Sequence, residues 1–543
     1  MPPAAPSDAP LPAPQPESPG LTRPLSLAAA YMLASMFIAL SQSLGQGFLA
    51  ANIPTLAGEL GATQSQTAWL MVAFMAPRAS LPLMLIKIRS QYGLRRFAEV
   101  SIALYAAVAL LSLLTRDLRS ALLVELLSGI SAAPLATLAF LYALEPLPQR
   151  LKLTVGLPFA LSFIALGMPL ARALSPAVLT DGSWTDILLL KLGMAMVCLF
   201  LVFRLPLPHG ERTRTIRGLD LISFSLIAAS FGGLVACFTT GYIYWWTAAA
   251  WIGPVLALSI AGLVLALVIE LHRTAPLLDV RWLATPEMLH LTAALLIFRV
   301  ILSEQTAGAP GLFQTLGFAP EQIAPLFWAI SLATLAGGAA CALVMKLDRV
   351  PTIHVVALLL IALGSAMDAH ANTDVSPTLM ITSQAMVGFA AAMFLPSAMA
   401  AGLVKALSKG PQYLLSFVIV FLSSQILGGT VGAGLFRTFV AVRTTAHGQA
   451  LAEGLQTGDP LVSARLAGIA AQLSSTVTDP VRLRAQAVAQ LAADTARQAT
   501  VSAYNDVFAL ISALALCALA ALLGHIARDW LRARMARHVP DAG

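Results

Sequence analysis

Long apolar segments follow one another along most of the chain, and they restrict its fold more than any other feature. A helix needs about 20 mainly apolar residues to cross the hydrocarbon core of a bilayer. Inside lipid the backbone groups must bond within the segment, which favours helices. Such segments occur at residues 25–48, 67–86, 97–115, 120–142, 154–175, 186–204, 219–239, 249–270, 289–312, 322–345, 353–370, 378–403, 412–436 and 503–527. The sequence therefore predicts an all-α integral membrane protein with fourteen transmembrane helices.

The overall composition agrees with this class and excludes a soluble enzyme. Of the 543 residues 58% are hydrophobic and only 11% are charged, whereas a soluble domain has about 25% charged residues. No phosphate-binding glycine loop and no nucleophile–base arrangement is recognisable, so we expect no enzymatic activity and no cofactor. The four cysteines are isolated within apolar runs, which predicts neither disulfides nor a metal site. The formal net charge of +7 comes from residues at the ends of apolar segments, so no nucleic-acid partner is expected.

The basic residues of the short loops lie mainly on one predicted side of the membrane. The opposite side holds only Arg116 and Arg119 in its short loops. The basic side holds Arg23, Lys87, Arg89, Arg95, Arg96, Arg150, Lys152, Arg204, Arg212, Arg214, Arg217, Arg273, Arg281, Lys346, Arg349, Lys405, Lys409, Arg528, Arg532, Arg534 and Arg537. The positive-inside rule then places the basic loops and both termini in the cytoplasm.

The chain divides into two predicted six-helix bundles with a linker between them. The predicted parts are a disordered tail (1–24), an N-terminal bundle (25–206), a linker with two helices (207–287), a C-terminal bundle (288–527) and a basic tail (528–543). The C-terminal bundle includes a long periplasmic loop (438–502), which is rich in Ala and Gln and is either a cover over the bundle or a docking surface.

Three weak sequence similarities occur at nearly the same separation along the chain and indicate an internal repeat. Lys87 and Lys346 follow equivalent helices 259 residues apart, and Gly129 and Gly388 differ by the same number. The segments "IALGMPLARAL" and "ILGGTVGAGLF" lie at nearly this offset. Repeated halves place the substrate site between them, near the middle of the membrane.

Several longer stretches carry a resemblance to a known family. They include "NIPTLAGELGATQSQTAWLMVAF" (Asn52–Phe74), "LDLISFSLIAASFGGLVACFTTGYIYWW" (Leu219–Trp246) and "AYNDVF" (Ala503–Phe508). The chain resembles the major facilitator superfamily, in its fourteen-helix drug:proton antiporter branch of the EmrB/QacA type. The resemblance implies proton-driven export across the bacterial inner membrane. In Gram-negative members it implies a periplasmic adaptor and an outer-membrane channel as partners.

The chain departs from the motifs of that family at charged positions. Its helix-1 Asp is replaced by Gly45, its helix-4 Arg by Glu125, and the first later Gly of its helix-5 motif by Arg172. The cytoplasmic loop motif reads "IKIRSQYGLRR", with Ser90 in place of the family's Asp. The residues expected to form the gating loop are Gly93, Arg95, Arg96 and, in the second half, Asp348 and Arg349.

A few charged residues fall inside the predicted spans and form the candidate site. The cations are Arg78, Arg172, Lys191 and Arg299, and the clearest acids are Glu125 and Glu304. An ionised side chain at mid-bilayer costs at least about 2.5–3.5 kcal/mol, so we expect these groups to face a cavity or one another. Their excess of positive charge favours amphipathic organic anions or weak acids as substrates over lipophilic cations.

Glu304 is the predicted proton carrier, because it lies 259 residues after Gly45, where the family has its acid. Low-dielectric surroundings favour the neutral form of a carboxyl, and a nearby cation favours the ionised form. The alternative is a structural ion pair with Arg299. Glu125, the second proton-coupling candidate, is expected to pair with Arg172.

Arg78 lies between Pro77 and Pro82, where helix 2 should bend. It is either an anion clamp or a strut to Glu125. Lys191 either joins the site or extends to the interface. The predicted function is a secondary active, proton-coupled exporter working by alternating access. The alternative is a non-transporting membrane protein of the same fold that acts as a sensor or scaffold.

Overall fold

The computed structural model describes residues 23–179, 183–208, 215–274, 276–455 and 459–536, and all regular structure within them is helical. Most of the predicted N-terminal tail, 1–22, and the last residues, 537–543, lie outside this part. Twelve of its helices are long and apolar enough to cross a membrane, and a bent pair can be counted as a thirteenth. The chain is therefore a multi-pass membrane protein, while the number fourteen stays a prediction.

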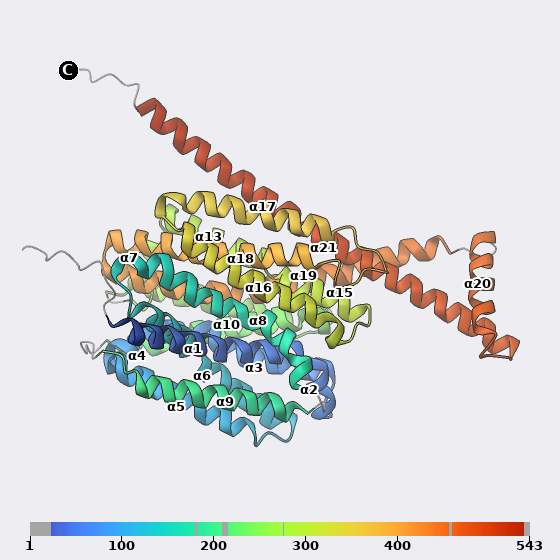
Figure 1. Ribbon diagram of the computed structural model, residues 1–543, viewed down its shortest axis with the longest axis horizontal. Helices are drawn as coiled ribbons and strands as arrows, with labels where there is room; N and C mark the ends of the chain where they lie inside the picture. Colours follow the sequence, from blue (N-terminus) through green and yellow to red (C-terminus); the bar gives the residue numbers. More distant parts are fainter. Residues whose placement is uncertain (1–22, 180–182, 209–214, 275, 456–458, 537–543) are drawn as a thin grey trace, which may run out of the picture.

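The first half of the chain contributes one bundle of helices (Figure 1). Helix α1 packs along α8 and α6, α3 packs on α6, and α5 packs on α9 and α6. The elements are α1 (Leu25–Ala51), α2 (Ile53–Glu59), α3 (Gln64–Ser80), α4 (Pro82–Tyr92), α5 (Leu94–Ser112), α6 (Leu118–Leu144), α7 (Gln149–Leu151), the π-helical turn η1 (Lys152–Gly156), α8 (Leu157–Val178) and α9 (Trp184–Arg204).

The second half contributes the other bundle, and α8 of the first half packs along α16 of the second. Within this half α16 and α17 pack on α18, and α19 and α17 pack on α21. The elements are α12 (Val280–Leu283), α13 (Pro286–Ile301), α14 (Glu304–Ala307), α15 (Ala309–Thr315), α16 (Pro320–Val344), the short η2 (Leu347–Arg349), α17 (Val350–Asp368), α18 (Ile381–Lys409), α19 (Pro411–Glu453), α20 (Pro460–Leu473) and α21 (Pro480–Ala536).

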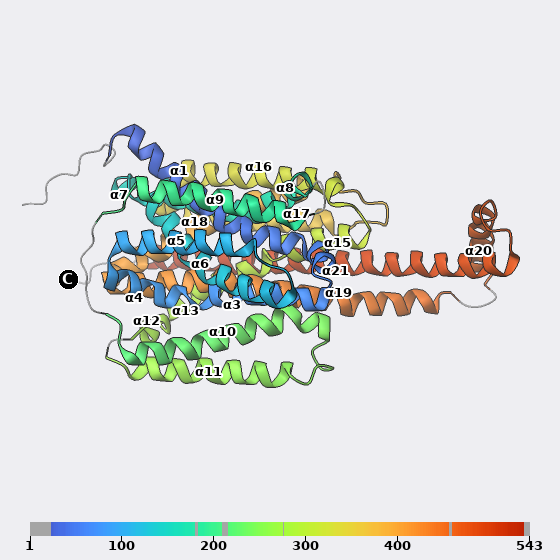
Figure 2. The ribbon, with the colours of Figure 1, turned by 90° about the horizontal axis from the view of Figure 1, so that it is seen from below.

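Between the two halves the chain forms a helical hairpin of α10 (Gly218–Tyr244) and α11 (Ile252–His272). Helix α10 packs against α3 of the first half and α19 of the second, whereas α11 packs mainly on α10. Figure 2 shows the hairpin along one side of the molecule, with α11 outermost. The hairpin thus contacts both halves through α10, while the two halves also pack on each other directly through α8 and α16.

Two of the spans are interrupted, and both interruptions occur near the candidate site. Helices α3 and α4 meet at an angle of 52°, beside Pro82 at the first position of α4. This confirms the bend predicted there, since proline cannot donate the backbone hydrogen bond of a continuous helix. The span Pro286–Thr315 is broken into α13, α14 and α15. A broken span can present side chains of adjacent turns to different neighbours.

A cluster of buried charges joins the hairpin to α4. The Asp220 carboxylate accepts from Lys87 Nζ at 2.7 Å and from Arg273 Nη2 at 2.5 Å. Arg273 Nη1 also donates to Glu270 at 2.6 Å, and Glu270 accepts from the backbone N–H of Leu277. We call these four charged residues, Lys87, Asp220, Glu270 and Arg273, the hairpin tether. It fixes α10 and α11 to α4.

The segment 438–502, predicted as a long loop between the last two spans, is largely helical in its described part. Helix α19 continues to Glu453, α20 follows, and α21 begins at Pro480. Both views show these parts projecting away from the bundles, so the expected cover over the bundle is wrong (Figures 1 and 2). The beginning of α1 and the end of α21 lie at the opposite end of the molecule (Figure 2).

Candidate functional site

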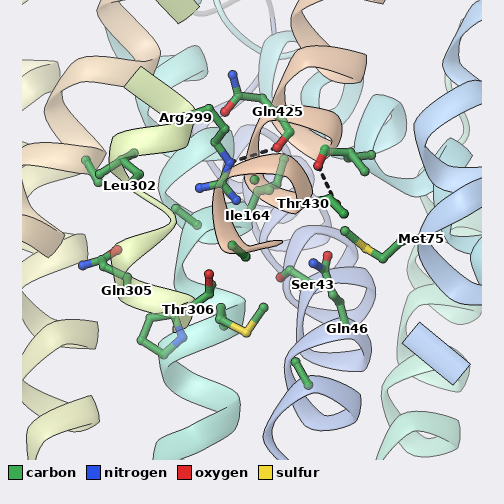
Figure 3. A pocket seen from close by; sticks show the side chains of 18 of the residues that line it. Ser43, Gln46, Met75, Ile164, Arg299, Leu302, Gln305, Thr306, Gln425 and Thr430 are labelled. Carbon is green, nitrogen blue, oxygen red and sulfur yellow. Dashed lines mark hydrogen bonds between the residues drawn. The ribbon is translucent and has the colours of Figure 1, made fainter. Parts of the chain in front are cut away.

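A cavity of about 260 Å³ lies between the two halves of the protein. It is lined by side chains from α1, α3, α8, α10, α13, α14, α16, α18 and α19. Four of the lining residues are arginines, namely Arg78, Arg172, Arg299 and Arg437, and in the described chain no Asp or Glu lines it. The remaining surface is mainly apolar, with uncharged polar groups such as Gln46 and Thr306 (Figure 3).

Arg78 enters the cavity from α3 and is held by neutral groups only. Its side chain is 6% exposed, with Nη1 donating to Gln46 Oε1 at 2.5 Å and Nη2 donating to Gln42. The guanidinium carbon lies 5.1 Å from the centre of the Phe74 ring. No carboxylate balances its charge among the described residues, so the strut from Arg78 to Glu125 is not formed.

Arg299 reaches the cavity from α13 and is directed by α19 (Figure 3). Its Nε donates to the backbone oxygen of Gln425 at 2.9 Å. The side chain lies over Gly428 and Gly429, and a Cβ added at Gly429 would be 3.1 Å from Nη2. Two glycines of α19 therefore make the space that Arg299 occupies. Within the described chain Arg299 forms no ion pair with Glu304, so that alternative is wrong.

Arg172 on α8 and Arg437 on α19 are the least restrained cations of the cavity. Arg172 lies 5.4 Å from the Phe327 ring centre, and Arg437 lies 5.3 Å from that of Tyr242. The buried Nε of Arg172 has no hydrogen-bond partner, and within the described residues Arg437 contacts the Tyr242 ring but forms no ion pair. Both residues line the cavity, so their donors are available to a ligand.

The sequence analysis does not identify Arg437, because this residue directly follows the predicted span 412–436 and precedes the predicted loop 438–502. The apolar sequence around it, "GLFRTFVAV", indicates that the helix continues beyond the arginine. A guanidinium inside such a run faces the same cost of burial as one inside a predicted span.

Glu125 pairs with a different cation from the one predicted. Lys191 Nζ lies 3.8 Å from Glu125 Oε1, and both residues are buried. Lys191 lines a second, very small cavity with Gly45 and Tyr105. The expected Glu125–Arg172 pair is therefore wrong, as is an extension of Lys191 to the interface. Position along a helix does not fix the direction in which the side chain points.

Glu304 does not line the central cavity, although its neighbours Gln305 and Thr306 do. Its carboxyl is directed toward α17 and α18, and Oε1 accepts from Gln384 Nε2 at 2.8 Å. The same nitrogen donates to Asp368 Oδ2 at 2.7 Å. Sequence analysis did not find Asp368 or Gln384, because Asp368 stands near the end of a predicted span and an isolated Gln carries no charge.

The predicted gating-loop residues lie at the turns after α4 and α16. Gly93 has φ of 84° between α4 and α5, a conformation that glycine adopts without strain. Arg95 Nε donates to Glu99 at 2.8 Å on the first turns of α5. Asp348 and Arg349 form η2 before α17. Nothing in this geometry tests a gating role, which stays a prediction.

Comparison with known proteins gives weak sequence relatives and clear structural ones. No protein-family model matches the chain. It is 24% identical to the uncharacterized transporter YebQ of Escherichia coli K12 over 202 residues, which is 37% of this chain and 44% of YebQ. It is 23% identical to the probable multidrug resistance protein EmrY of the same organism over 288 residues, 50% of this chain and 55% of EmrY. The matched stretches thus span about half the length of these relatives.

Two solved structures share the arrangement of nearly the whole chain. One is the human organic anion transporter MFSD10, with a TM-score of 0.54 at 14% identity over 91% of this chain and 100% of that chain. The other is a bacterial homologue of the human drug peptide transporters PepT1 and PepT2, with a TM-score of 0.52 at 12% identity over 94% and 99%. This chain has the major facilitator transporter fold.

YebQ and MFSD10 are described as transporters, the bacterial homologue is described by its relation to peptide transporters, and EmrY is described as a probable multidrug resistance protein. None of these descriptions is of an enzyme, in agreement with the sequence prediction. The fold places the cavity between two helical halves, where the internal repeat predicts it. The narrower assignment to the fourteen-helix antiporter branch stays a prediction.

Proposed function

We propose that this protein is a secondary active exporter of the bacterial inner membrane that exchanges amphipathic organic anions or weak acids for protons. The observation that supports the substrate class is the central cavity, with four arginines and no acid among the described lining residues. Buried charges without partners are costly. A bound anion would supply the missing counter-charge, and a guanidinium can hold a carboxylate or sulfonate through two parallel hydrogen bonds.

The apolar lining supports an amphipathic rather than a small inorganic substrate. Met71, Met75 and Met168 face the cavity together with Phe327 and Leu395. Methionine side chains are flexible and adapt to apolar groups of different shape. A molecule with one anionic group and an aromatic or aliphatic body matches both parts of this surface.

The arrangement of the spans supports fourteen crossings with both termini in the cytoplasm. Fourteen crossings result when the bent pair α3–α4 and helix α5, which has arginines at its beginning, are added to the twelve spans. In this count α10 and α11 form a hairpin inserted between two halves of six helices each. The helices α4, α7 and α12, which adjoin basic loops, lie at the end of the molecule where α1 begins, and by the positive-inside rule that end is cytoplasmic in this proposal. We call the projecting helical part of the segment 438–502 the helical extension. It then lies in the periplasm, where an adaptor of a tripartite pump would meet it.

The proton in this proposal is carried by Glu304 and not by Glu125, because Lys191 balances the charge of Glu125. Glu304 is 1% exposed and lies behind the cavity wall. Protonation there and substrate binding in the cavity act on the same two halves, so each can favour one orientation of an alternating-access cycle. The weak similarity to EmrY, described as a probable multidrug resistance protein, supports export as the direction.

Flux measurements in vesicles test this function. Purified protein reconstituted with an imposed pH gradient should accumulate anionic dyes such as fluorescein, and a protonophore should abolish the accumulation. Lipophilic cations such as ethidium should move at least about tenfold more slowly, since a lost charge-assisted contact costs about 1.5–3 kcal/mol. Movement of cations alone would contradict the substrate class, and movement of neither would favour the sensor or scaffold.

A further inference from the structure

A second polar site lies behind the cavity, between α14, α17 and α18. Glu304, Asp368 and Gln384 are each at most 3% exposed. The Gln384 amide nitrogen donates to both carboxyl groups, at 2.8 Å to Glu304 and 2.7 Å to Asp368. Ser383 donates its hydroxyl to the other oxygen of Asp368. Because the two carboxyl oxygens share one nitrogen, they lie within roughly 5 Å of each other.

No cation balances these two acids within the described residues. Arg299 is directed to the cavity on the other face of the broken span. On the helices packed around the pair, Arg437 of α19 also lines the cavity, and Asp506 of α21 binds Arg443 and His447. Two buried carboxylates this close cannot both be ionised at low cost.

Two buried acceptor atoms at the site have no hydrogen-bond partner in the structure. They are Oε2 of Glu304 and Oε1 of Gln384. A carboxylate and an amide oxygen only accept, whereas a protonated carboxyl also donates. A proton is therefore the ligand that removes the excess negative charge and supplies a donor where donors are lacking.

The first half of the repeat shows how such a position looks when its charge is balanced. At the offset of 259 residues Gln384 corresponds to Glu125, Glu304 to Gly45 and Asp368 to Ala109. Gly45 and Ala109 line the small cavity with Lys191, and Lys191 pairs with Glu125. One acid with its own cation in the first half thus corresponds to two acids without a cation in the second.

From this geometry we propose that Glu304 and Asp368, bridged by Gln384, form a single proton-binding site that is separate from the substrate cavity. The proposal rests on the antiport function for its role in transport, but proton binding itself does not depend on that function. The two carboxyl groups titrate together, so the bound proton is shared by the pair and is not assigned to one residue.

The broken span connects this site to the cavity. Glu304 is the first residue of α14, and Gln305 and Thr306 of the same short helix line the cavity. A Cβ added at Gly308 would lie 2.9 Å from Glu304 Oε1, so glycine there leaves room for the carboxyl beside the helix break. A change of charge at Glu304 therefore acts on the cavity wall through a single helical turn.

Infrared titration of the purified full-length protein tests proton binding without any substrate. We expect the wild type to show a protonated-carboxyl band that disappears as the pH rises. Glu304→Gln and Asp368→Asn should each weaken this band and move its midpoint at least about one pH unit lower, because the remaining acid loses its like-charged neighbour. Asp506→Asn, which changes an acid with cationic partners, should leave it unchanged. A band that neither buried variant alters, or one that responds to Na⁺ instead of pH, would overturn the proposal.

Transport with fluorescein as the probe separates this site from the proposed function. Both buried variants should lose at least tenfold of the uptake driven by a pH gradient but retain fluorescein exchange without a gradient, since neither residue lines the cavity. Full gradient-driven uptake in both variants would overturn the site while leaving the exporter intact. A normal infrared titration in a protein that moves no fluorescein would support the site and contradict the exporter.

Discussion

Arg172→Gln and Arg437→Gln are each expected to reduce the uptake of an anionic dye by roughly 10- to 100-fold. Both residues line the cavity, so their donors can be used by the substrate. A hydrogen bond to a charged group contributes about 1.5–3 kcal/mol, and each 1.4 kcal/mol changes an affinity about tenfold. Initial rates in reconstituted vesicles, over a range of dye concentrations, measure the effect.

Two further variants show whether the loss comes from charge at the cavity. Arg172→Lys keeps the charge but not the planar pair of donors, so its uptake should lie between those of the wild type and Arg172→Gln. Arg482→Gln removes an arginine whose side chain is 81% exposed on the helical extension, and it should transport normally. Wild-type rates in both cavity glutamine variants would show that the arginines do not bind the substrate.

Asp220→Asn is expected to lower the stability of the protein by about 3 kcal/mol, because it leaves a buried cation of the hairpin tether without its partner. The Asp220 side chain is fully buried and accepts from both Lys87 and Arg273. Arg273 keeps Glu270 as a partner in the variant, so Lys87 is the residue left unbalanced. The thermal unfolding midpoint in detergent should fall by several degrees.

A second substitution provides the matched test of this prediction. Lys87→Gln combined with Asp220→Asn restores neutrality and should recover much of the lost stability, since replacing both members of a buried pair is often nearly neutral. Arg95→Gln breaks the partly exposed pair with Glu99 nearby and should cost no more than about 1 kcal/mol. Equal melting temperatures for the wild type and Asp220→Asn would show that the tether does not hold the hairpin.

The approximate positions of twelve spans could be predicted from the sequence, because a long apolar segment is what a helix needs to cross a bilayer. The bend at Pro82 was predictable for a similarly local reason, the missing backbone donor. The helical form of 438–502 was predicted less well. Its Ala- and Gln-rich sequence has helical spacing, but hydropathy does not distinguish an extended helix from a loop outside the membrane.

Which residues line the cavity could be predicted only in part, because this depends on which face each helix turns toward the cavity. Arg299 and Glu304 lie five residues apart and point to different neighbours, one into the cavity and one toward Gln384. The break between α13 and α14 lies between these two residues, so a continuous helical pattern does not predict their relative direction. Arg172 was the predicted partner of Glu125 because both residues lie at a similar depth in the membrane. The direction of the side chain also matters, and Lys191 is the residue that lies beside Glu125.

Equilibrium binding of two dyes with opposite charges tests whether the arginine-lined cavity binds organic anions. Naphthalene dyes that carry either a sulfonate or a trimethylammonium group have nearly the same apolar body. We expect the purified protein to bind the sulfonate at least tenfold more tightly, and we expect Arg172→Gln to remove most of this preference. Equal affinity for the two dyes, or tighter binding of the trimethylammonium dye, would contradict it.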